Sequence, residues 1–600
     1  MKKSIFLLLF MLIYSQTAAQ KTWSDPEITV KDIQGHLKYL ADDKMKGRFT
    51  GSPEEKEAAN YIKDSFVKDG LKPAFGDSYF QDFDFIERID LTKNNSLELI
   101  FDGKTKTLEL RKDFTTAPFS GVKSGEFDLV FAGYGISSEK LNYDDYAGID
   151  VKNKVVVVMR YNPEYDSSKT EFDRYSSYRV KANTAKEKGA AGIIFVNPPH
   201  PKNEADELME LRFDGAMGID ELAAFQVKKD VIEELLSFKG KDFADIQKGI
   251  DDSKTPNSFS LDSEKVKLST ETKYVHNKGR NVAAILEGSD PILKNEYIVI
   301  GGHYDHLGID QLKTASMYKG DVPMIHNGAD DNASGTTGVL ETAEKLASKK
   351  SDIKRSIIFI TFSGEEMGLL GSTYFTNNSP VELEAITSML NMDMIGRLDS
   401  VNSLTVIGTG TSSIWKDLLN KENKYAFQLG MNDAGSGGSD HQSFTNKNIP
   451  VLFFFTGTHT DYHKPSDDYD KINFDGLRKV AELASDIALD NANSEKRPDF
   501  VKVEAPSMRG AARSKVTVGT VPEFGYNGKG YKISGVSEGG SAQKAGMKPG
   551  DIMIKFGSKT IDNIYDFMYA IGECNPGDKV DVVVLRDDKE VTLNMEMQAK

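Results

Sequence analysis

Two adjacent glutamates, Glu365 and Glu366, follow the apolar segment RSIIFIT at residues 355–361. Such a segment is typical of a buried strand, and burying a carboxylate without a partner is costly. Like charges side by side also repel each other. The pair therefore requires cations or water opposite it.

Other metal-capable side chains follow the apolar segments of the same region. In chain order the candidate ligands are His303, Asp331, Glu366, Asp393 and His463. Two imidazoles and three carboxylates suit two divalent ions about 3.5–4 Å apart that share one carboxylate. His303 and Asp393 are predicted to bind one ion. Glu366 and His463 are predicted to bind the other, with Asp331 as the bridge.

Glu365 is left over by this assignment. Adjacent residues diverge in direction, so Glu366 can bind a metal while Glu365 stays free. Metal-bound water has a pKa of about 7, and Glu365 could take its proton and pass it to a leaving amine. Asp305, two residues after His303, is predicted to hold the other nitrogen of that imidazole and fix its tautomer.

Substrate contacts are predicted for four further residues. Tyr462 is a candidate hydrogen-bond donor to the oxyanion, or else a packed aromatic residue. Asp440 and His441 are expected near the pocket rim, in a structural or supporting role. Arg397 could recognise a substrate carboxylate, which would favour a carboxypeptidase, or form an ordinary ion pair.

The elements that position these residues alternate between strand and helix patterns from about residue 280 to residue 493. This alternation predicts an α/β domain with a doubly wound, mostly parallel sheet flanked by helices. Ligands of such sheets collect at the carboxyl ends of the strands. The candidate residues lie at those positions.

A chain of 600 residues is too long for one core and predicts several domains. The expected divisions are a signal peptide at 1–19, the first part of the catalytic domain at 20–112, a β-rich insert at 113–263, the rest of the catalytic domain at 264–495, a linker at 496–514 and an α+β domain at 515–600. The glycine-rich segment GRFTGSP at 47–53 lacks phosphate-loop spacing and is interpreted as a plain turn between two helices.

The first residues combine two lysines, a short apolar run and small residues before a cleavage point, as export signals do. We therefore expect a periplasmic or secreted protein. No later segment has the roughly 18 apolar residues of a transmembrane helix, so no membrane span is expected. The single cysteine, Cys574, excludes an internal disulfide, and the net charge of −16 argues against a nucleic-acid partner.

The sequence resembles the M28 zinc peptidases, the aminopeptidase Y or leucyl aminopeptidase-like group. The resemblance rests on the motifs GGHYDH, GADDNASG, FSGEEMGLLGS, NMDMIG and DYHKPSDD, in this order. It implies the zinc exopeptidase fold, two zinc ions on the five ligands named above, a catalytic Glu365 and a supporting Asp305. It also implies a cis peptide bond between Asp331 and Asn332.

The two other domains also resemble known modules. The insert is similar to a protease-associated (PA) domain, which would shape substrate access or serve as a spacer. Residues 515–600 resemble a PDZ domain, although VTVGTV at 516–521 departs from the usual carboxylate-binding loop. This domain would either bind a peptide or protein ligand or pack against the catalytic domain.

The expected function is that of an exported two-zinc aminopeptidase acting on peptides, with a metal-bridging hydroxide as nucleophile and Glu365 as general base and acid. Cobalt or manganese could replace zinc. An M28-type carboxypeptidase or dipeptidase is the alternative. Two further alternative functions are a glutaminyl cyclase-like enzyme and a noncatalytic peptide-binding scaffold.

Overall fold

The computed structural model describes residues 27–503 and 516–599, except 166–169, 202–204, 214–216, 310–314, 319, 321, 436, 523–528, 537–538, 549, 562–566, 568–569, 572–573 and 587–588. The expected signal peptide at 1–19 and most of the expected linker lie outside the described residues. Within them, no helix combines the length and apolar character needed to cross a bilayer.

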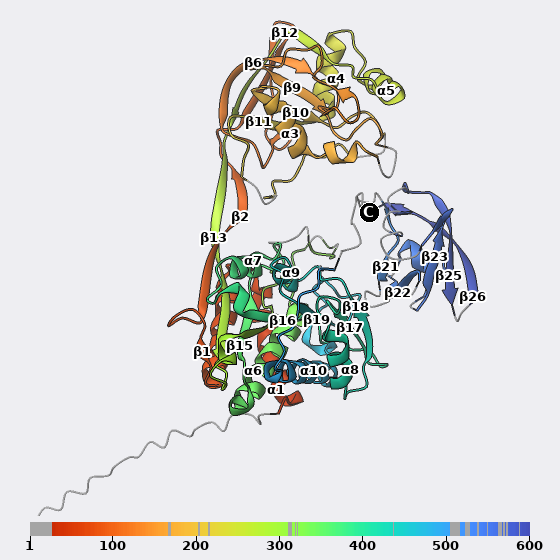
Figure 1. Cartoon of the computed structure of the whole chain (residues 1–600). Helices are drawn as coiled ribbons and strands as arrows, with labels where there is room; N and C mark the ends of the chain where they lie inside the picture. The colour runs from red at the N-terminus through yellow and green to blue at the C-terminus, as the bar shows by residue number, and fades with distance from the viewer. Residues whose placement is uncertain are drawn as a thin grey trace, which may run out of the picture.

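A nine-stranded mixed sheet forms the centre of the α/β domain, with the order β1-β13-β15-β14-β16-β19-β17-β18 and β2 beside β13 (Figure 1). The strands are β1 (Lys72–Pro73), β2 (Phe80–Leu91), β13 (Thr272–Leu286), β14 (Tyr297–His303), β15 (Ser356–Phe362), β16 (Ile386–Met392), β17 (Ser403–Ile407), β18 (Gln428–Asn432) and β19 (Val451–Phe455). The central strands β15, β14, β16 and β19 are parallel. The mostly parallel α/β fold predicted from the sequence is thus confirmed.

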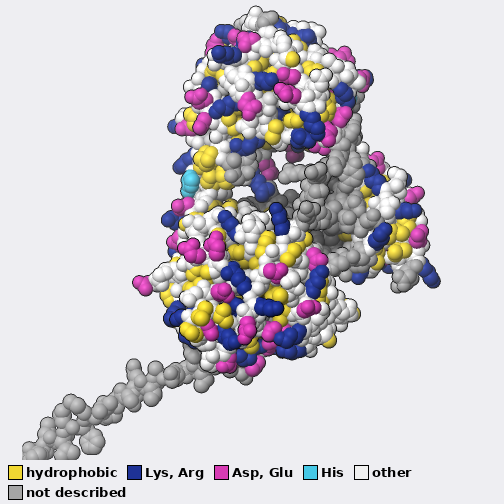
Figure 2. All heavy atoms as spheres, in the orientation of Figure 1, with side chains coloured by type: hydrophobic (Ala, Val, Ile, Leu, Met, Phe, Trp, Pro, Cys, Tyr) yellow, Lys and Arg dark blue, Asp and Glu magenta, His cyan; other side chains and the backbone are white. Residues whose placement is uncertain are grey.

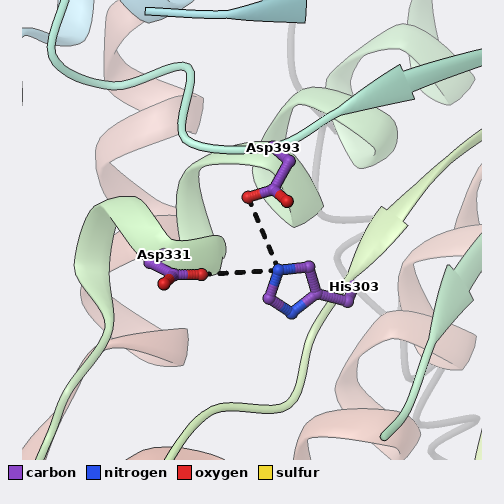
Figure 3. Close-up of side chains that lie close together, drawn as sticks. All are labelled: His303, Asp331 and Asp393. Carbon is purple, nitrogen blue, oxygen red and sulfur yellow. Dashed lines mark ion pairs between the residues drawn. The ribbon is translucent and has the colours of Figure 1, made fainter. Parts of the chain in front are cut away.

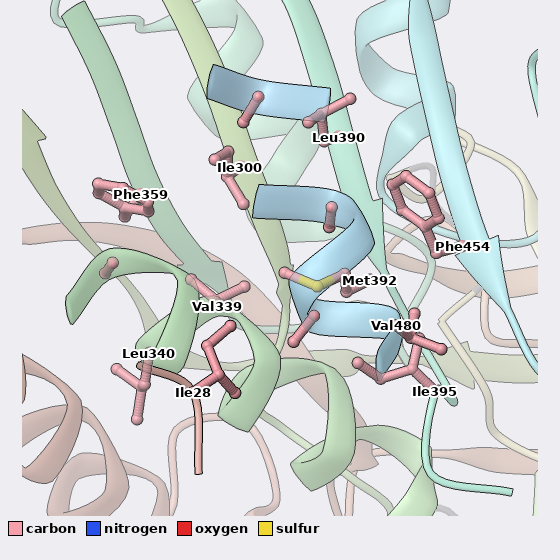
Figure 4. Packing of buried hydrophobic residues seen from close by; sticks show 14 of the residues in the cluster. Ile28, Ile300, Val339, Leu340, Phe359, Leu390, Met392, Ile395, Phe454 and Val480 are labelled. Carbon is pink, nitrogen blue, oxygen red and sulfur yellow. The ribbon is translucent and has the colours of Figure 1, made fainter. Parts of the chain in front are cut away.

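Helices cover both faces of this sheet. They are α1 (Val30–Leu40), α2 (Pro53–Lys68), α6 (Gly335–Ser348), α7 (Leu370–Asn377), α8 (Trp415–Glu422), α9 (His441–Thr445) and α10 (Phe474–Asn493). Alternate residues of β15 pack on opposite sides: Phe359 joins the core under α6 and α10, shown in Figure 4, and Ile358 joins the core under α7 and α9. A strand buried on both faces explains the unbroken apolar run before the two glutamates.

The insert has its own eight-stranded sheet, with the order β4-β3-β12-β6-β9-β10-β11-β5. Its elements are β3 (Ser96–Phe101), β4 (Lys104–Thr107), β5 (Phe114–Thr116), β6 (Lys123–Phe131), β9 (Val155–Met159), α3 (Tyr178–Glu187), β10 (Gly192–Val196), β11 (Ala223–Val227), α4 (Lys229–Phe238), α5 (Phe243–Ser253) and β12 (Phe259–Thr270). The expected boundary at 112/113 falls inside this sheet, because β3 and β4 precede it. The helices α3, α4 and α5 accompany this sheet.

A two-stranded ribbon joins the insert to the α/β domain. The outer parts of β2 and β13 pair antiparallel from Phe80 and Val282 to Leu91 and Thr272. Figure 1 shows this ribbon running from the sheet to the insert, and Figure 2 shows an open space between the two domains beside it. The insert is therefore attached to the sheet by both of its chain ends at one edge.

The C-terminal domain has a separate core that includes Ile533, Met553 and Val584. Its elements are β20 (Val516–Thr517), β21 (Thr520–Pro522), β22 (Tyr531–Val536), α11 (Ser541–Lys544), β23 (Ile552–Phe556), β24 (Lys559–Thr560), β25 (Lys579–Arg586), β26 (Lys589–Glu596) and β27 (Gln598–Ala599). The strands β22, β23, β25 and β26 and the helix α11 agree with the expected α+β class. Cys574 is a buried residue of this core.

Candidate metal centre

The first cluster of donor atoms surrounds His303 at the carboxyl end of β14. His303 Nε2 lies 3.4 Å from Asp331 Oδ1 and 3.4 Å from Asp393 Oδ1. Figure 3 shows both carboxylates pointing at this nitrogen from two other segments, the turn before α6 and the loop after β16. His303, Asp331 and Asp393 form a group that could hold a metal ion.

A second cluster lies on the other side of Asp331. His463 Nε2 is 3.1 Å from Asp331 Oδ2 and 3.3 Å from Glu366 Oε2. The second group with metal-binding geometry contains His306, Asp331 and Glu366. His306 Nδ1 lies 2.6 Å from Glu366 Oε1, so two imidazoles flank the Glu366 carboxylate.

The two oxygens of Asp331 therefore face two different histidines. Asp331 lies in the turn η4 (Ala329–Ser334), and its peptide bond to Asn332 is cis. Asp467 fixes this turn, because its Oδ2 accepts hydrogen bonds from the backbone amides of Asp330 at 2.9 Å and Asp331 at 3.0 Å. This is the placement that a carboxylate shared by two ions requires.

The spacing of the donor atoms fits zinc. Four ligands at Zn–N and Zn–O distances of about 2.0–2.1 Å in a tetrahedron lie about 3.3 Å from one another. The separations from His303 Nε2 to Asp331 and Asp393, and from His463 Nε2 to Asp331 and Glu366, are 3.1–3.4 Å. Asp393 adds a second indication: its Oδ2 accepts a hydrogen bond from Ser439, whereas its buried Oδ1 has no hydrogen-bond partner. An oxygen of this kind is available for a cation.

The environment drives the pKa values of the adjacent glutamates apart. Burial raises the pKa of Glu365 well above its usual value; His303 opposes this, and Glu366 and Asp440 add to it. Burial and Asp331 also act to raise the pKa of Glu366, but the imidazoles of His463 and His306 lower it to about 2. Glu366 is thus an ionised ligand candidate, and Glu365 is a group that can hold a proton. Such divergence is typical of acid–base sites.

The cluster carries excess negative charge. Burial alone would lower the pKa of both histidines, yet Glu366 and Asp331 raise that of His463 to about 11. Asp393 and Glu365 raise the pKa of His303 well above its usual value. The site therefore favours positive charge among its carboxylates, which divalent cations would supply.

Asp305 contacts His303 and Glu365, as expected for a supporting residue. Its backbone oxygen lies 3.2 Å from His303 Nδ1, and its Oδ1 lies 3.7 Å from the same nitrogen. Oδ1 also accepts a hydrogen bond from the backbone amide of Glu365. The carboxylate is fully buried, so these contacts fix both the ring and the start of the FSGEEMG segment.

Two of the four predicted substrate contacts lie beside the cluster. The Tyr462 ring stacks on the imidazole of His463, with the ring centroids 3.9 Å apart. Arg397 Nη2 donates to Asp461 Oδ2 at 3.1 Å and to Asp467 Oδ1 at 3.2 Å. The Arg397 guanidinium thus forms ion pairs within the protein, the alternative to substrate carboxylate binding.

Asp440 and His441 lie behind the cluster and are fully buried. His441 stacks on Phe453 with the centroids 4.6 Å apart, and burial lowers its pKa to about 3. Burial also raises the pKa of Asp440, to about 7. Both side chains are buried, whereas the sequence placed them near the rim of the pocket.

Sequence reasoning gave no role to His306, Asp467 or the GRFTGSP segment. His306 stands three residues after His303 at the same strand end, and this spacing could have indicated a second imidazole. Asp467 belongs to the DYHKPSDD motif but carries no distinguishing pattern of its own. The segment read as a plain turn contains Arg48, whose side chain is fully buried beneath the cluster.

Comparison with known families finds one match in each of the three domains. Residues 281–488 match Peptidase family M28, residues 123–235 match the PA domain, and residues 508–597 match the PDZ domain. All five candidate ligands and Glu365 lie within the first match.

Two curated relatives are bacterial enzymes. Aminopeptidase YwaD of Bacillus subtilis (strain 168) is 33% identical over 186 residues, which cover 29% of this chain and 40% of the relative. Leupeptin-inactivating enzyme 1 of Streptomyces exfoliatus is 32% identical over 187 residues, which cover 31% and 37%. The chain thus spans about two fifths of the length of these relatives.

Among solved structures, the aminopeptidase from Aneurinibacillus sp. strain AM-1 has a TM-score of 0.48 at 22% identity, covering 80% of this chain and 97% of that one. A zinc aminopeptidase from Bacillus subtilis has a TM-score of 0.45 at 22% identity, covering 80% and 100%.

Proposed function

Because residues 281–488 match Peptidase family M28, we propose that this chain is a two-metal aminopeptidase. The observation that carries the proposal is the position of Asp331 between His303 and His463, with one carboxylate oxygen facing each imidazole. One cluster would hold an ion with His303 and Asp393. The other would hold an ion with His463 and Glu366.

When bound, two divalent ions would lower the pKa of a water molecule to about 7 and polarise the scissile carbonyl. Glu365 would take the proton from the attacking water and deliver it to the leaving amine. Burial raises the pKa of Glu365, which suits a group that receives and returns a proton. Asp305 would hold His303 and Glu365 in register, through the contacts described above.

Removal of the N-terminal residue is favoured over a carboxypeptidase activity by two features. The carboxylates around His303 favour a cationic group, and a free peptide N-terminus supplies one. Arg397, the candidate for binding a substrate carboxylate, pairs with Asp461 and Asp467. A noncatalytic scaffold would have no use for a complete set of ligands and a separate base.

The proposal is tested with aminoacyl p-nitroanilides and their N-acetylated counterparts. We expect the protein to hydrolyse only the free-amine substrates, to lose activity on chelation and to regain it with zinc. Metal analysis should give two ions per chain. Hydrolysis of blocked substrates, or release of C-terminal residues from a peptide, would contradict the aminopeptidase assignment.

We also propose that the protein is exported, to the periplasm or the medium, on the basis of residues 1–19. The lysines and the apolar run that follows them support this proposal. N-terminal sequencing of the protein recovered from cell fractions tests it. A chain in the cytoplasm that retains its first residues would contradict it.

A further inference from the structure

The segment Gly47–Ser52, which comprises the end of η1 (Asp43–Arg48) and the turn before α2, contacts the segments that carry the candidate metal ligands. It comes from the part of the chain before the insert, outside residues 281–488 that match the peptidase family. Two of its side chains, Arg48 and Thr50, are fully buried. A buried cation and a buried hydroxyl in a turn require an explanation, since turns usually lie at the surface.

Arg48 binds the backbone of the two segments that carry metal ligands. Its Nε donates to the carbonyl of Tyr304 at 2.7 Å, between His303 and Asp305. Its Nη1 donates to the carbonyl of Asn327 at 2.7 Å, and its Nη2 to that of Gly328 at 3.1 Å, just before the turn with Asp331. A planar guanidinium can hold several acceptors in fixed directions, whereas an ammonium cannot.

The backbone of the same turn strengthens this attachment. The carbonyls of Gly47 and Arg48 accept hydrogen bonds from the amides of Gly308 and His306. Gly47 has φ +69°, and a Cβ atom there would lie 2.4 Å from the carbonyl oxygen of His326. The turn therefore approaches the ligand-bearing segment as closely as a backbone without side chains allows.

Thr50 reaches the centre by a different route. Its hydroxyl donates to Asp305 Oδ2 at 2.9 Å. The other carboxylate oxygen of Asp305 accepts a hydrogen bond from the Glu365 amide and faces His303. The Thr50 hydroxyl therefore supplies a hydrogen bond to the second oxygen of a fully buried carboxylate. Without that hydroxyl, Oδ2 would lose this partner in an interior where an unmade hydrogen bond is costly.

We propose that Arg48 and Thr50 are positioning residues of the metal centre, which act on zinc binding through the Tyr304, Gly328 and Asp305 contacts. The inference rests on the proposed function only in taking the metal to be zinc. It makes the segment before the insert an obligatory part of the site. Partners one layer outside metal ligands typically change metal affinity by about 10–100-fold, and effects of this size are expected here.

The test measures the zinc dissociation constant of the full chain by competition with a chromophoric chelator, without reference to peptidase activity. Thr50→Val keeps the side-chain shape but removes the hydroxyl, and should weaken zinc binding about tenfold. Thr50→Ser should restore most of the affinity. Arg48→Lys keeps the charge but loses the fork, and should weaken binding by about 10–100-fold.

Ser52→Ala provides a matched control in the same turn. Ser52 caps α2 by accepting a hydrogen bond from the Glu55 amide, so its loss should lower the unfolding temperature and leave zinc affinity unchanged. Wild-type zinc affinity in Thr50→Val and Arg48→Lys would overturn the inference. If Arg48→Lys fails to fold, the Thr50 pair decides. A protein that binds zinc but hydrolyses no peptide would refute the proposed function without affecting this result.

Discussion

Asp467 offers a sharp test of how the turn that carries Asp331 is held. Asp467→Asn keeps the size of the side chain but removes its charge. One amide oxygen can still accept from the Asp330 and Asp331 amides, and the NH2 group then faces Arg397 Nη2, which the carboxylate contacts at 3.2 Å. Two donors meet where an ion pair stood, in a side chain with no exposed surface.

The structure sets the magnitude of the loss. Breaking a buried ion pair costs about 3–5 kcal/mol, and the second contact of Arg397, with Asp461, places the loss near the lower value. If the loss appears as mobility of the Asp331 turn, zinc binding must restore the order. About 3 kcal/mol then corresponds to roughly 100-fold weaker binding.

Zinc competition titrations of the Asp467→Asn protein measure this effect. Asp461→Asn is the matched control, because Asp461 also pairs with Arg397 at 3.1 Å, whereas the hydrogen bonds to the Asp330 and Asp331 amides come from Asp467. We expect the control to weaken zinc binding by less than tenfold. Equal losses in the two variants, or wild-type affinity in Asp467→Asn, would refute the reasoning.

Three further predictions concern the base, the helical layer and a tight backbone contact. Glu365→Gln should lower kcat by about 10²–10⁴-fold while zinc stoichiometry stays at its wild-type value; retained turnover would exclude Glu365 as the base. Burial, together with Lys68, lowers the pKa of His36 to about 4. Between pH 6.5 and pH 4 the His36 imidazole is therefore protonated in the unfolded chain and neutral in the folded chain. Stability should therefore fall as the pH falls through this window, by about 2 kcal/mol between pH 7.5 and pH 5, and urea unfolding of His36→Gln should lack this part of the slope; equal slopes would contradict it. Gly335→Ala would bring Cβ within 2.1 Å of the Met392 carbonyl oxygen and should lower the free energy of unfolding by about 1–3 kcal/mol. Gly249→Ala is the control, because a Cβ atom there would meet no atom within 4 Å. Equal unfolding temperatures of the two variants would contradict the steric argument.

The sequence indicated the α/β sheet because its strands are buried on both faces. Continuous runs such as SIIFITF are typical of strands buried on both faces. Ligands collect at the carboxyl ends of parallel strands, and this rule predicts from the sequence that His303, Asp331 and Asp393 belong to one site. The same rule applies to Glu366. These residues could be predicted because each is a metal-binding type of side chain that follows an apolar strand segment.

The supports of the centre could not be found in this way. Arg48 binds carbonyl groups, which every residue possesses, so no pattern of side chains marks its partners. Asp467 likewise binds backbone amides. The edge of the insert was missed for a related reason. β3 pairs with β12, far along the chain, and β4 joins the sheet through β3, and short strands do not show in sequence which sheet they join.

The ribbon that carries the insert has a consequence for how such a protein can be rebuilt. Leu91 and Thr272 are direct partners across the ribbon, so the ends of the 92–271 segment lie about 5 Å apart. A short hairpin turn could bridge that gap without shifting the pairing that leads down to the sheet. The insert can thus be exchanged as a unit, and its replacement by another module should leave the pairing of β2 with β13 below it, and with it the candidate metal centre, unchanged.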